Sequence, residues 1–210
     1  MIVILDREGD DLMSEVTCDI SVSVDGFAAG PNQTLEEPFG EGDVERVHTW
    51  MFEGREDNVS EVEAITAAGA FIMGRNMFSP GRGEWDLDWK GYWGEEPPYH
   101  APVFVLTHHP REPLEMQGGT TYRFVTDGIE SALEQARAAA GDRNVSIAGG
   151  AATVNQYLAA GLIDELRLHV APILLGAGER VFEGVPNLTL QPVAGRHTDL
   201  VTHLTYRFSR

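Results

Sequence analysis

At 210 residues the chain has the length of one domain, and its 15 basic and 33 acidic residues give a formal charge of −18. That charge disfavours nucleic acids and anionic membranes as partners, because phosphate contacts require a basic surface. No apolar run approaches the roughly 20 residues that span a bilayer, and the apolar start at 1–5 is too short for a secretory signal, so we expect a cytoplasmic protein. A single cysteine, Cys18, excludes an intrachain disulfide and a cysteine cluster for zinc, and the histidines show no spacing typical of metal ligands.

The acidic N-terminal residues show no hydrophobic periodicity, and the first regular element follows them. Residues 1–14 are predicted to be a disordered leader, and residues 15–210 a single domain. Residues 16–24 alternate between apolar and polar side chains, which predicts a half-buried strand with Cys18 in the core. The strand ends at the turn dipeptide Asp25-Gly26.

Helices are predicted from their start and stop signals. Asp43 is a candidate N-cap for a helix up to Phe52, and Ser60 opens a capping box for a helix that runs to Ala68. Asp127 is the candidate cap of a helix over 128–140, and an apolar period over 153–158 predicts another that stops at Gly161.

Strands are expected between and after these helices. The candidate strands cover residues 70–73, 103–106, 122–125, 145–148, 166–170, 188–194 and 200–208. Alternation of strands and helices, followed by a run of strands, predicts an α/β three-layer sandwich. Its central sheet is mainly parallel with an antiparallel C-terminal hairpin, and helices cover both faces.

The stretch Val145–Ala152 carries the clearest functional signal. A strand runs into Gly149 and Gly150, and a helix begins directly after them. Glycine lets a ligand approach the backbone closely, and the first N–H groups of the helix offer donors and partial positive charge to a phosphate. The alternative is a tight turn without a ligand.

Several polar residues follow directly on predicted parallel strands. They are Asp25, Gly74 with Arg75, Thr107 with His108, Thr126 with Asp127, and the two glycines. Ligands of such sheets bind beyond the carboxyl ends of the strands, so these residues are the candidate site.

Six motifs in chain order resemble the dihydrofolate-reductase-like superfamily. They are Ser21–Phe27, Met73–Arg75, Val105–Thr107, Ile147–Ala151, Ala160–Leu166 and Pro172–Gly178. The branch they resemble most is the C-terminal reductase domain of the riboflavin-biosynthesis deaminase/reductase. No Cys-x-x-Cys is present, so nothing resembles the zinc-binding deaminase half of those enzymes.

The resemblance implies NADPH as cofactor and a homodimer as the assembly. Gly149 and Gly150 would hold the pyrophosphate, with Ala151, Ala152 and Thr153 opening the helix behind them. Gly74 and Arg75 match the family's Gly-Arg step, where the arginine pairs with cofactor phosphate. Thr107 and His108 would contact the 2′-phosphate, and Thr126 would complete the cofactor site from the next strand.

Asp25 is the candidate catalytic residue on the substrate side. Its carboxylate could accept hydrogen bonds from a heterocycle or stand near a proton-transfer path; the alternative is an ordinary turn residue. Folate reductases carry their acid on the helix after the first loop, where Glu41, Asp43 and Glu45 are all possible equivalents.

The segment 80–101, called here the tryptophan segment, holds Trp85, Trp89 and Trp93. Aromatic rings there could close over a planar ligand, pack on the domain or form a dimer contact.

The sequence favours the first of three functions and leaves the other two as alternatives. The first is an NADPH-dependent oxidoreductase acting on a small planar heterocycle such as a pterin, a pyrimidine or a riboflavin precursor. The second is a non-catalytic nucleotide-binding module of the same fold. The third is an interaction protein that uses its aromatic segment, with the glycines merely turning the chain.

Overall fold

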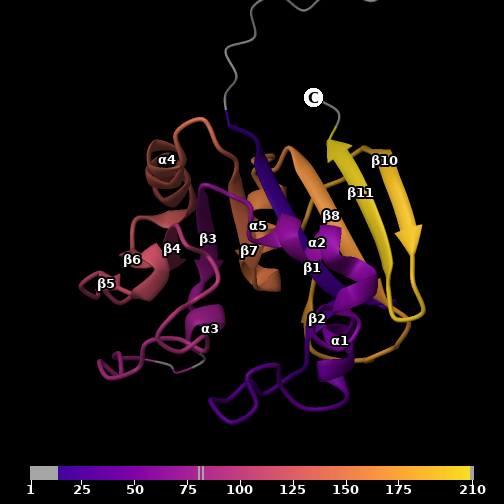
Figure 1. Ribbon diagram of the computed structural model, residues 1–210, viewed down its shortest axis with the longest axis horizontal. Coiled ribbons are helices and arrows are strands. Elements are labelled where there is room, and N and C mark those ends of the chain that lie inside the picture. Colours follow the sequence, from indigo (N-terminus) through magenta and orange to yellow (C-terminus); the bar gives the residue numbers. More distant parts are fainter. Residues whose placement is uncertain (1–13, 80, 82, 209–210) are drawn as a thin grey trace, which may run out of the picture.

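The computed structural model describes residues 14–79, 81 and 83–208; the predicted leader, apart from residue 14, lies outside them. A nine-stranded sheet organises these residues in the order β10-β11-β8-β1-β7-β3-β4-β6-β5 (Figure 1). Its strands are β1 (Val16–Ser23), β3 (Ala70–Gly74), β4 (Pro102–Leu106), β5 (Leu114–Glu115), β6 (Thr121–Val125), β7 (Val145–Gly149), β8 (Glu165–Ala171), β10 (Leu190–His197) and β11 (Thr202–Phe208). A separate antiparallel pair joins β2 (Phe27–Ala29) to β9 (Glu179–Arg180).

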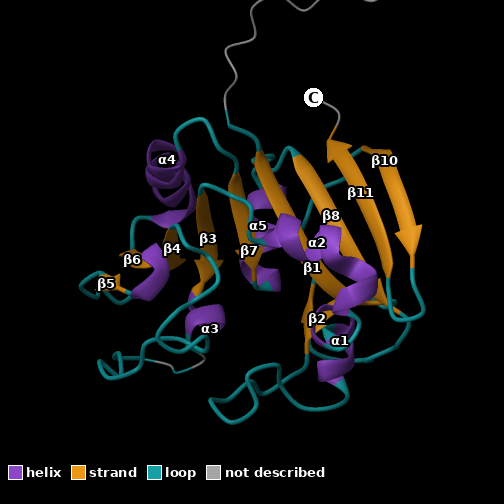
Figure 2. Cartoon of the chain, viewed as in Figure 1, coloured by secondary structure: helices purple, strands orange, loops and turns teal. Residues whose placement is uncertain are grey.

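The centre of the sheet is parallel. Strands β8, β1, β7, β3, β4 and β6 pair in parallel, so their carboxyl ends lie at one edge. Strand β11 runs antiparallel to β8 and forms a hairpin with β10, and β5 runs antiparallel to β6. The predicted mainly parallel sheet with its antiparallel C-terminal hairpin is therefore confirmed (Figure 2).

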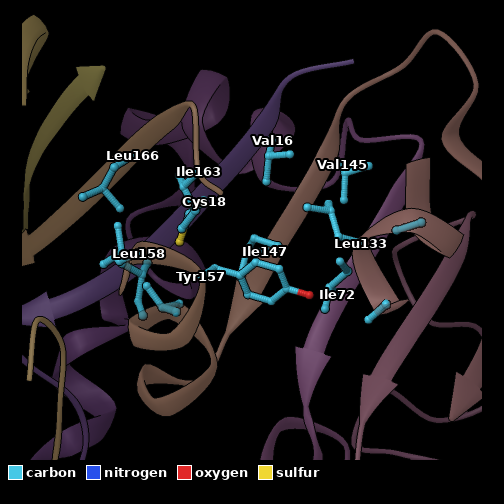
Figure 3. Packing of buried hydrophobic residues seen from close by; sticks show 14 of the residues in the cluster. Val16, Cys18, Ile72, Leu133, Val145, Ile147, Tyr157, Leu158, Ile163 and Leu166 are labelled. Atoms are coloured by element: carbon cyan, nitrogen blue, oxygen red, sulfur yellow. The ribbon is translucent and has the colours of Figure 1, made fainter. Parts of the chain in front are cut away.

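Helices cover both faces of this sheet. They are α1 (Thr49–Phe52), α2 (Val59–Ile65), α3 (Arg75–Phe78), α4 (Gly128–Ala140) and α5 (Ala151–Ala159), with 3-10 turns at Val44–Val47, Arg55–Asn58 and Gln117–Gly119. Leu133 of α4 and Tyr157 of α5 pack with Cys18 and Ile147 in the main core (Figure 3). Trp50 of α1 and Val62 of α2 pack on the opposite face of the sheet. Beside them, Trp85 and Trp89 of the tryptophan segment pack against β3 and β4. None of the described helices is both long and apolar enough to cross a bilayer.

Strand β1 corrects one prediction. It is buried along its whole length, because it lies between β7 and β8 with packed layers on both faces. Cys18 is in the core as predicted. The polar side chains of Asp19, Ser21 and Ser23 face a second buried layer rather than solvent.

The predicted helix caps are wrong in their details. Asp43 makes no capping hydrogen bond, and its segment forms a 3-10 turn followed by the short helix α1. Helix α2 begins at Val59 and ends at Ile65, and the Ser60 hydroxyl bonds to the neighbouring Glu61 carboxylate instead of closing a capping box. Asp127 precedes α4 but its side chain caps nothing. Side chains at these starts are exposed, and other partners compete for them.

Candidate functional site

The predicted site residues meet along the carboxyl edge of the sheet. Met73 of β3 pairs with Gly149 of β7, Gly74 pairs with Leu106 of β4, and Leu106 pairs with Val125 of β6. The residues that follow these four strands therefore stand in a row with neighbours about 5 Å apart. The glycines, the Gly74–Arg75 step, Thr107 and Thr126 are brought together in this row.

Gly149 and Gly150 form an open turn in front of α5. Gly149 has a φ of +117°, which favours glycine, and its peptide bond to Gly150 is cis. Around Gly150 there is open space: a Cβ added there would meet no atom within 4 Å. The Gly150 carbonyl accepts from the N–H groups of Thr153 and Val154 at 3.0 and 3.1 Å. The amides of Ala151 and Ala152 lie ahead of these bonds, at the helix N-terminus where donors have no intrahelical acceptor.

Close packing against α5 requires a glycine at position 74. A Cβ at this position would clash with the Thr153 side chain, which is buried against it. The hydroxyl of Thr153 therefore lies behind the glycine turn, and this pair fixes the distance between α5 and the end of β3.

Arg75 begins α3 and reaches towards the tryptophan segment. Its guanidinium lies 3.9 Å from the centre of the Trp85 ring, and Nη2 donates to the Glu84 carbonyl at 3.4 Å. The indole N–H of Trp85 donates to the His109 carbonyl, and that of Trp89 to the Phe78 carbonyl. Trp85 and Trp89 thus pack on the domain, whereas Trp93 remains exposed.

The ends of β4 and β6 differ in how they present their polar residues. The Thr107 hydroxyl is buried and accepts from the N–H of His109 at 3.1 Å, which turns the chain after β4. His108 is exposed at this turn, and Thr126 is exposed beyond β6. Exposed imidazole and hydroxyl groups are therefore available at this end of the row.

Asp25 is held by three hydrogen bonds. Its Oδ1 accepts from the Ser23 hydroxyl at 2.6 Å and from the Leu175 N–H at 3.1 Å, and its Oδ2 accepts from the Gly176 N–H at 2.8 Å. The Ser23 hydroxyl and these amides lower the pKa of Asp25 from 3.8 to about 2. The carboxylate stays ionised at neutral pH, which favours a role as hydrogen-bond acceptor over a role as proton donor.

We expect this hydrogen bonding to appear as an acid dependence of stability. A carboxyl whose folded pKa is depressed stabilises the fold above its unfolded pKa, near 4, and that contribution is lost as pH falls through the folded value of about 2. A ¹³C NMR titration should follow the Asp25 carboxyl to this low value. A midpoint at the ordinary value for aspartate would mean that the bonds from the Ser23 hydroxyl and from the amides of residues 175 and 176 do not form in solution.

One positioning residue gave no signal in the sequence. Asn155 on α5 accepts from the N–H of Phe182 at 2.7 Å and donates to the carbonyl of Arg180 at 2.9 Å. It ties the segment after β9 to the helix that carries the glycine turn. Its role depends on backbone groups of residues 180 and 182, which the fold alone brings next to α5.

The fold and the row of residues at its carboxyl edge define a dihydrofolate-reductase-like α/β protein. The model of the RibD C-terminal domain family matches residues 14–205, and the chain belongs to this family. Membership supports oxidoreductase chemistry in general.

Two relatives, one in sequence and one in structure, cover most of the chain. The uncharacterized protein YyaP of Bacillus subtilis is 23% identical over 173 residues, which cover 80% of this chain and 79% of that protein. A putative riboflavin biosynthesis protein from Shewanella sp. PV-4 superposes with a TM-score of 0.66 at 22% identity, covering 93% of this chain and 99% of that one.

Two further structures carry reductase names. The deaminase/reductase of Thermotoga maritima gives a TM-score of 0.58 at 15% identity, and this chain covers 57% of that protein with 94% of its own length. The riboflavin biosynthesis reductase Rib7 of Saccharomyces cerevisiae gives 0.52 at 12% identity, with 97% of this chain and 93% of that one covered. At these identities the likeness shows the fold alone.

Proposed function

We propose that the protein is an NADPH-dependent reductase of a small planar heterocycle of the pyrimidine or pterin type. The observation that carries the proposal is the open glycine turn at Gly149 and Gly150, in one row with the ends of β3, β4 and β6. The names of the structural relatives, a riboflavin biosynthesis reductase among them, support the reaction class.

The residues of the edge suit a dinucleotide phosphate. The open space at Gly150 admits a pyrophosphate to the amides of Ala151 and Ala152, where the helix dipole favours negative charge. Arg75, Thr107 and His108 offer a cation, an oxygen and an imidazole within the same row. These local donors work against a net charge of −18, so they define where an anion can bind.

Asp25 is the proposed substrate contact. Its carboxylate has room for about four hydrogen bonds, and three come from the protein itself, so one remains for an N–H of a heterocycle. NADPH supplies the hydride when it is bound. The chain's own contribution is to hold the ring through this charged acceptor.

The first test is a thermal-shift comparison of nucleotides. NADPH should raise the melting temperature, and NADH should do so much less because it lacks the 2′-phosphate. At 100 times the dissociation constant the stabilisation should be about 2.7 kcal/mol. Absence of any shift with either nucleotide at millimolar concentration would sink the proposal. A shift without NADPH oxidation across a panel of pyrimidinones and pterins would favour the non-catalytic module.

Arg75→Ala should weaken NADPH binding by about 1.5–3 kcal/mol, the range for a hydrogen bond to a charged group. The loss should shrink as salt rises, since screening already weakens the contact of the parent. Arg46→Ala is the matched control, because Arg46 is an exposed arginine paired with Asp43, away from the row. Equal dissociation constants for the Arg75 and Arg46 variants at low salt would leave Arg75 as a support for Trp85 alone.

A further inference from the structure

Trp85 of the tryptophan segment contacts residues at the ends of three neighbouring strands. The guanidinium of Arg75, directly after β3, lies 3.9 Å from the centre of its ring. Its indole N–H donates to the carbonyl of His109, in the loop that follows β4, at 2.8 Å. Its ring lies 5.0 Å from that of Phe124 on β6, at an interplanar angle of 63°. One side chain therefore connects the ends of β3, β4 and β6.

The Trp85 ring is itself held in place by the domain. It meets the ring of Phe78, a buried residue of α3, at 5.8 Å and 79°. Arg111 holds the main chain that follows the ring, because its Nη2 donates to the carbonyl of Leu87 at 3.0 Å and to that of Trp89 at 2.7 Å. The indole is therefore a fixed support for the groups that contact it.

The face of the indole orients the guanidinium of Arg75. At 3.9 Å the guanidinium carbon lies against the ring face, where the π electrons attract a cation. Nη2 of Arg75 also donates to the carbonyl of Glu84, the residue before Trp85, at 3.4 Å. An arginine binds phosphate oxygens through N–H groups in its own plane, and a ring on its face does not compete for them. The stack therefore restricts the side chain in advance, which lowers the entropy cost of binding an anion.

The edge of the same indole fixes the loop after β4. Both backbone polar groups of His109 are bound, since its N–H donates to the Thr107 hydroxyl at 3.1 Å and its carbonyl accepts from Trp85. Between the two loop residues lies His108, whose side chain is exposed. Trp85 thus holds Arg75 with its face and the loop that carries His108 with its edge.

These contacts all lie on one side of the glycine turn. In the sheet β3 stands between β7, which ends in that turn, and β4. Because Trp85 binds the loop after β4 and packs on β6, it holds the guanidinium of Arg75 towards β4 and away from the glycines. A dinucleotide with its pyrophosphate at Gly150 and its adenosine towards β4 would bring a 2′-phosphate to this place.

We propose that Trp85 is a positioning residue for the 2′-phosphate of NADPH and sets the preference for NADPH over NADH. Its ring places the guanidinium of Arg75, and its N–H places the loop of His108. This inference rests on the proposed function, because it requires the dinucleotide at the carboxyl edge. It makes the tryptophan segment a support of the cofactor site.

Two variants of Trp85 separate the ring from its N–H. Trp85→Leu removes both, and the ratio of the NADH to the NADPH dissociation constant should fall about tenfold. Trp85→Phe keeps a ring against Arg75 and loses the N–H, so the ratio should fall only about threefold, the size of one neutral hydrogen bond. Trp89→Leu is the matched control: its indole N–H donates to the Phe78 carbonyl, and its ring contacts Tyr92 instead of Arg75. This control should lower the melting temperature and leave the ratio unchanged.

Fragments of the cofactor report on the 2′-phosphate without turnover. In calorimetry Trp85→Leu should weaken adenosine 2′,5′-bisphosphate and leave 5′-AMP unchanged. If Trp85 acts through Arg75, then Trp85→Leu should weaken the bisphosphate less in the Arg75→Ala background than in the parent.

The outcomes distinguish this inference from the proposed function. A parent that binds NADPH, with an unchanged ratio in folded Trp85→Leu or equal falls in Trp85→Leu and Trp89→Leu, overturns the positioning role alone. If Trp85→Leu does not fold, Trp85→Phe decides by the same ratio, and an unchanged value overturns the proposal. No NADPH binding by the parent is instead a failure of the proposed function, and the role of Trp85 falls with it.

Discussion

Gly150→Val is expected to abolish NADPH binding while the protein still folds. The φ of Gly150 is −70°, which a valine adopts readily, and the position of its Cβ is surrounded by open space. The Cβ of the new side chain therefore has no atom within 4 Å other than those of its neighbours along the chain. It occupies instead the volume through which a pyrophosphate would reach the first amides of α5.

The neighbouring glycine gives a useful contrast. Gly149 has a positive φ, and a Cβ there would lie 2.9 Å from the sulfur of Met77, so Gly149→Val should damage the fold itself. Gln156→Val is the control for a β-branched residue on the exposed face of α5, away from its N-terminus. Calorimetry measures the NADPH affinity of each variant, and circular dichroism checks that each variant is folded. A folded Gly150→Val that binds NADPH like the parent would reduce the glycine pair to a turn.

The fold and the row at its edge could be predicted because they depend on local signals. Gly149 and Gly150 interrupt a strand–helix pattern, and each of Arg75, Thr107 and Thr126 follows a short apolar run. The carboxyl ends of parallel strands must meet at one edge, so sequence order alone brings these residues together.

The second polar layer could not be predicted, because it depends on pairings between distant strands. The alternation in β1 places Asp19 and Ser21 on the face opposite the apolar side chains. The same alternation would be found if solvent covered that polar face. What covers them is His169 on β8 and Trp50 on α1, which the tertiary fold alone brings there. Histidines without ligand spacing in the sequence gave no sign of the pair that His169 forms with His203.

The role of Asp25 was predictable only in part. Its place at the end of β1 follows from the strand pattern, but the amides that bind its carboxylate come from residues 175 and 176, about 150 positions later. Those bonds remove the proton-donor role that the sequence left open. They leave two interpretations, a charged acceptor for substrate and a carboxylate that only holds the turn.

Asp25→Asn is expected to cut turnover by about 10²-fold, the scale for a substrate that is misplaced by about 1 Å, and to leave NADPH affinity nearly unchanged. An asparagine keeps the shape but offers one acceptor oxygen. Its amide would face the N–H of Gly176, so the side chain can no longer hold both that loop and a substrate N–H.

Asp43→Asn is the matched control, since Asp43 is an exposed carboxylate in the acidic group with Glu41 and Glu45. Steady-state NADPH oxidation with the best heterocycle gives kcat and KM for each variant. A loss confined to Asp25→Asn, with melting temperature and NADPH affinity retained, assigns the effect to the substrate side. Full activity in Asp25→Asn together with a loss in Asp43→Asn would move the substrate contact to the acidic group, because the carboxylate at the end of β1 would then serve only to hold residues 175 and 176.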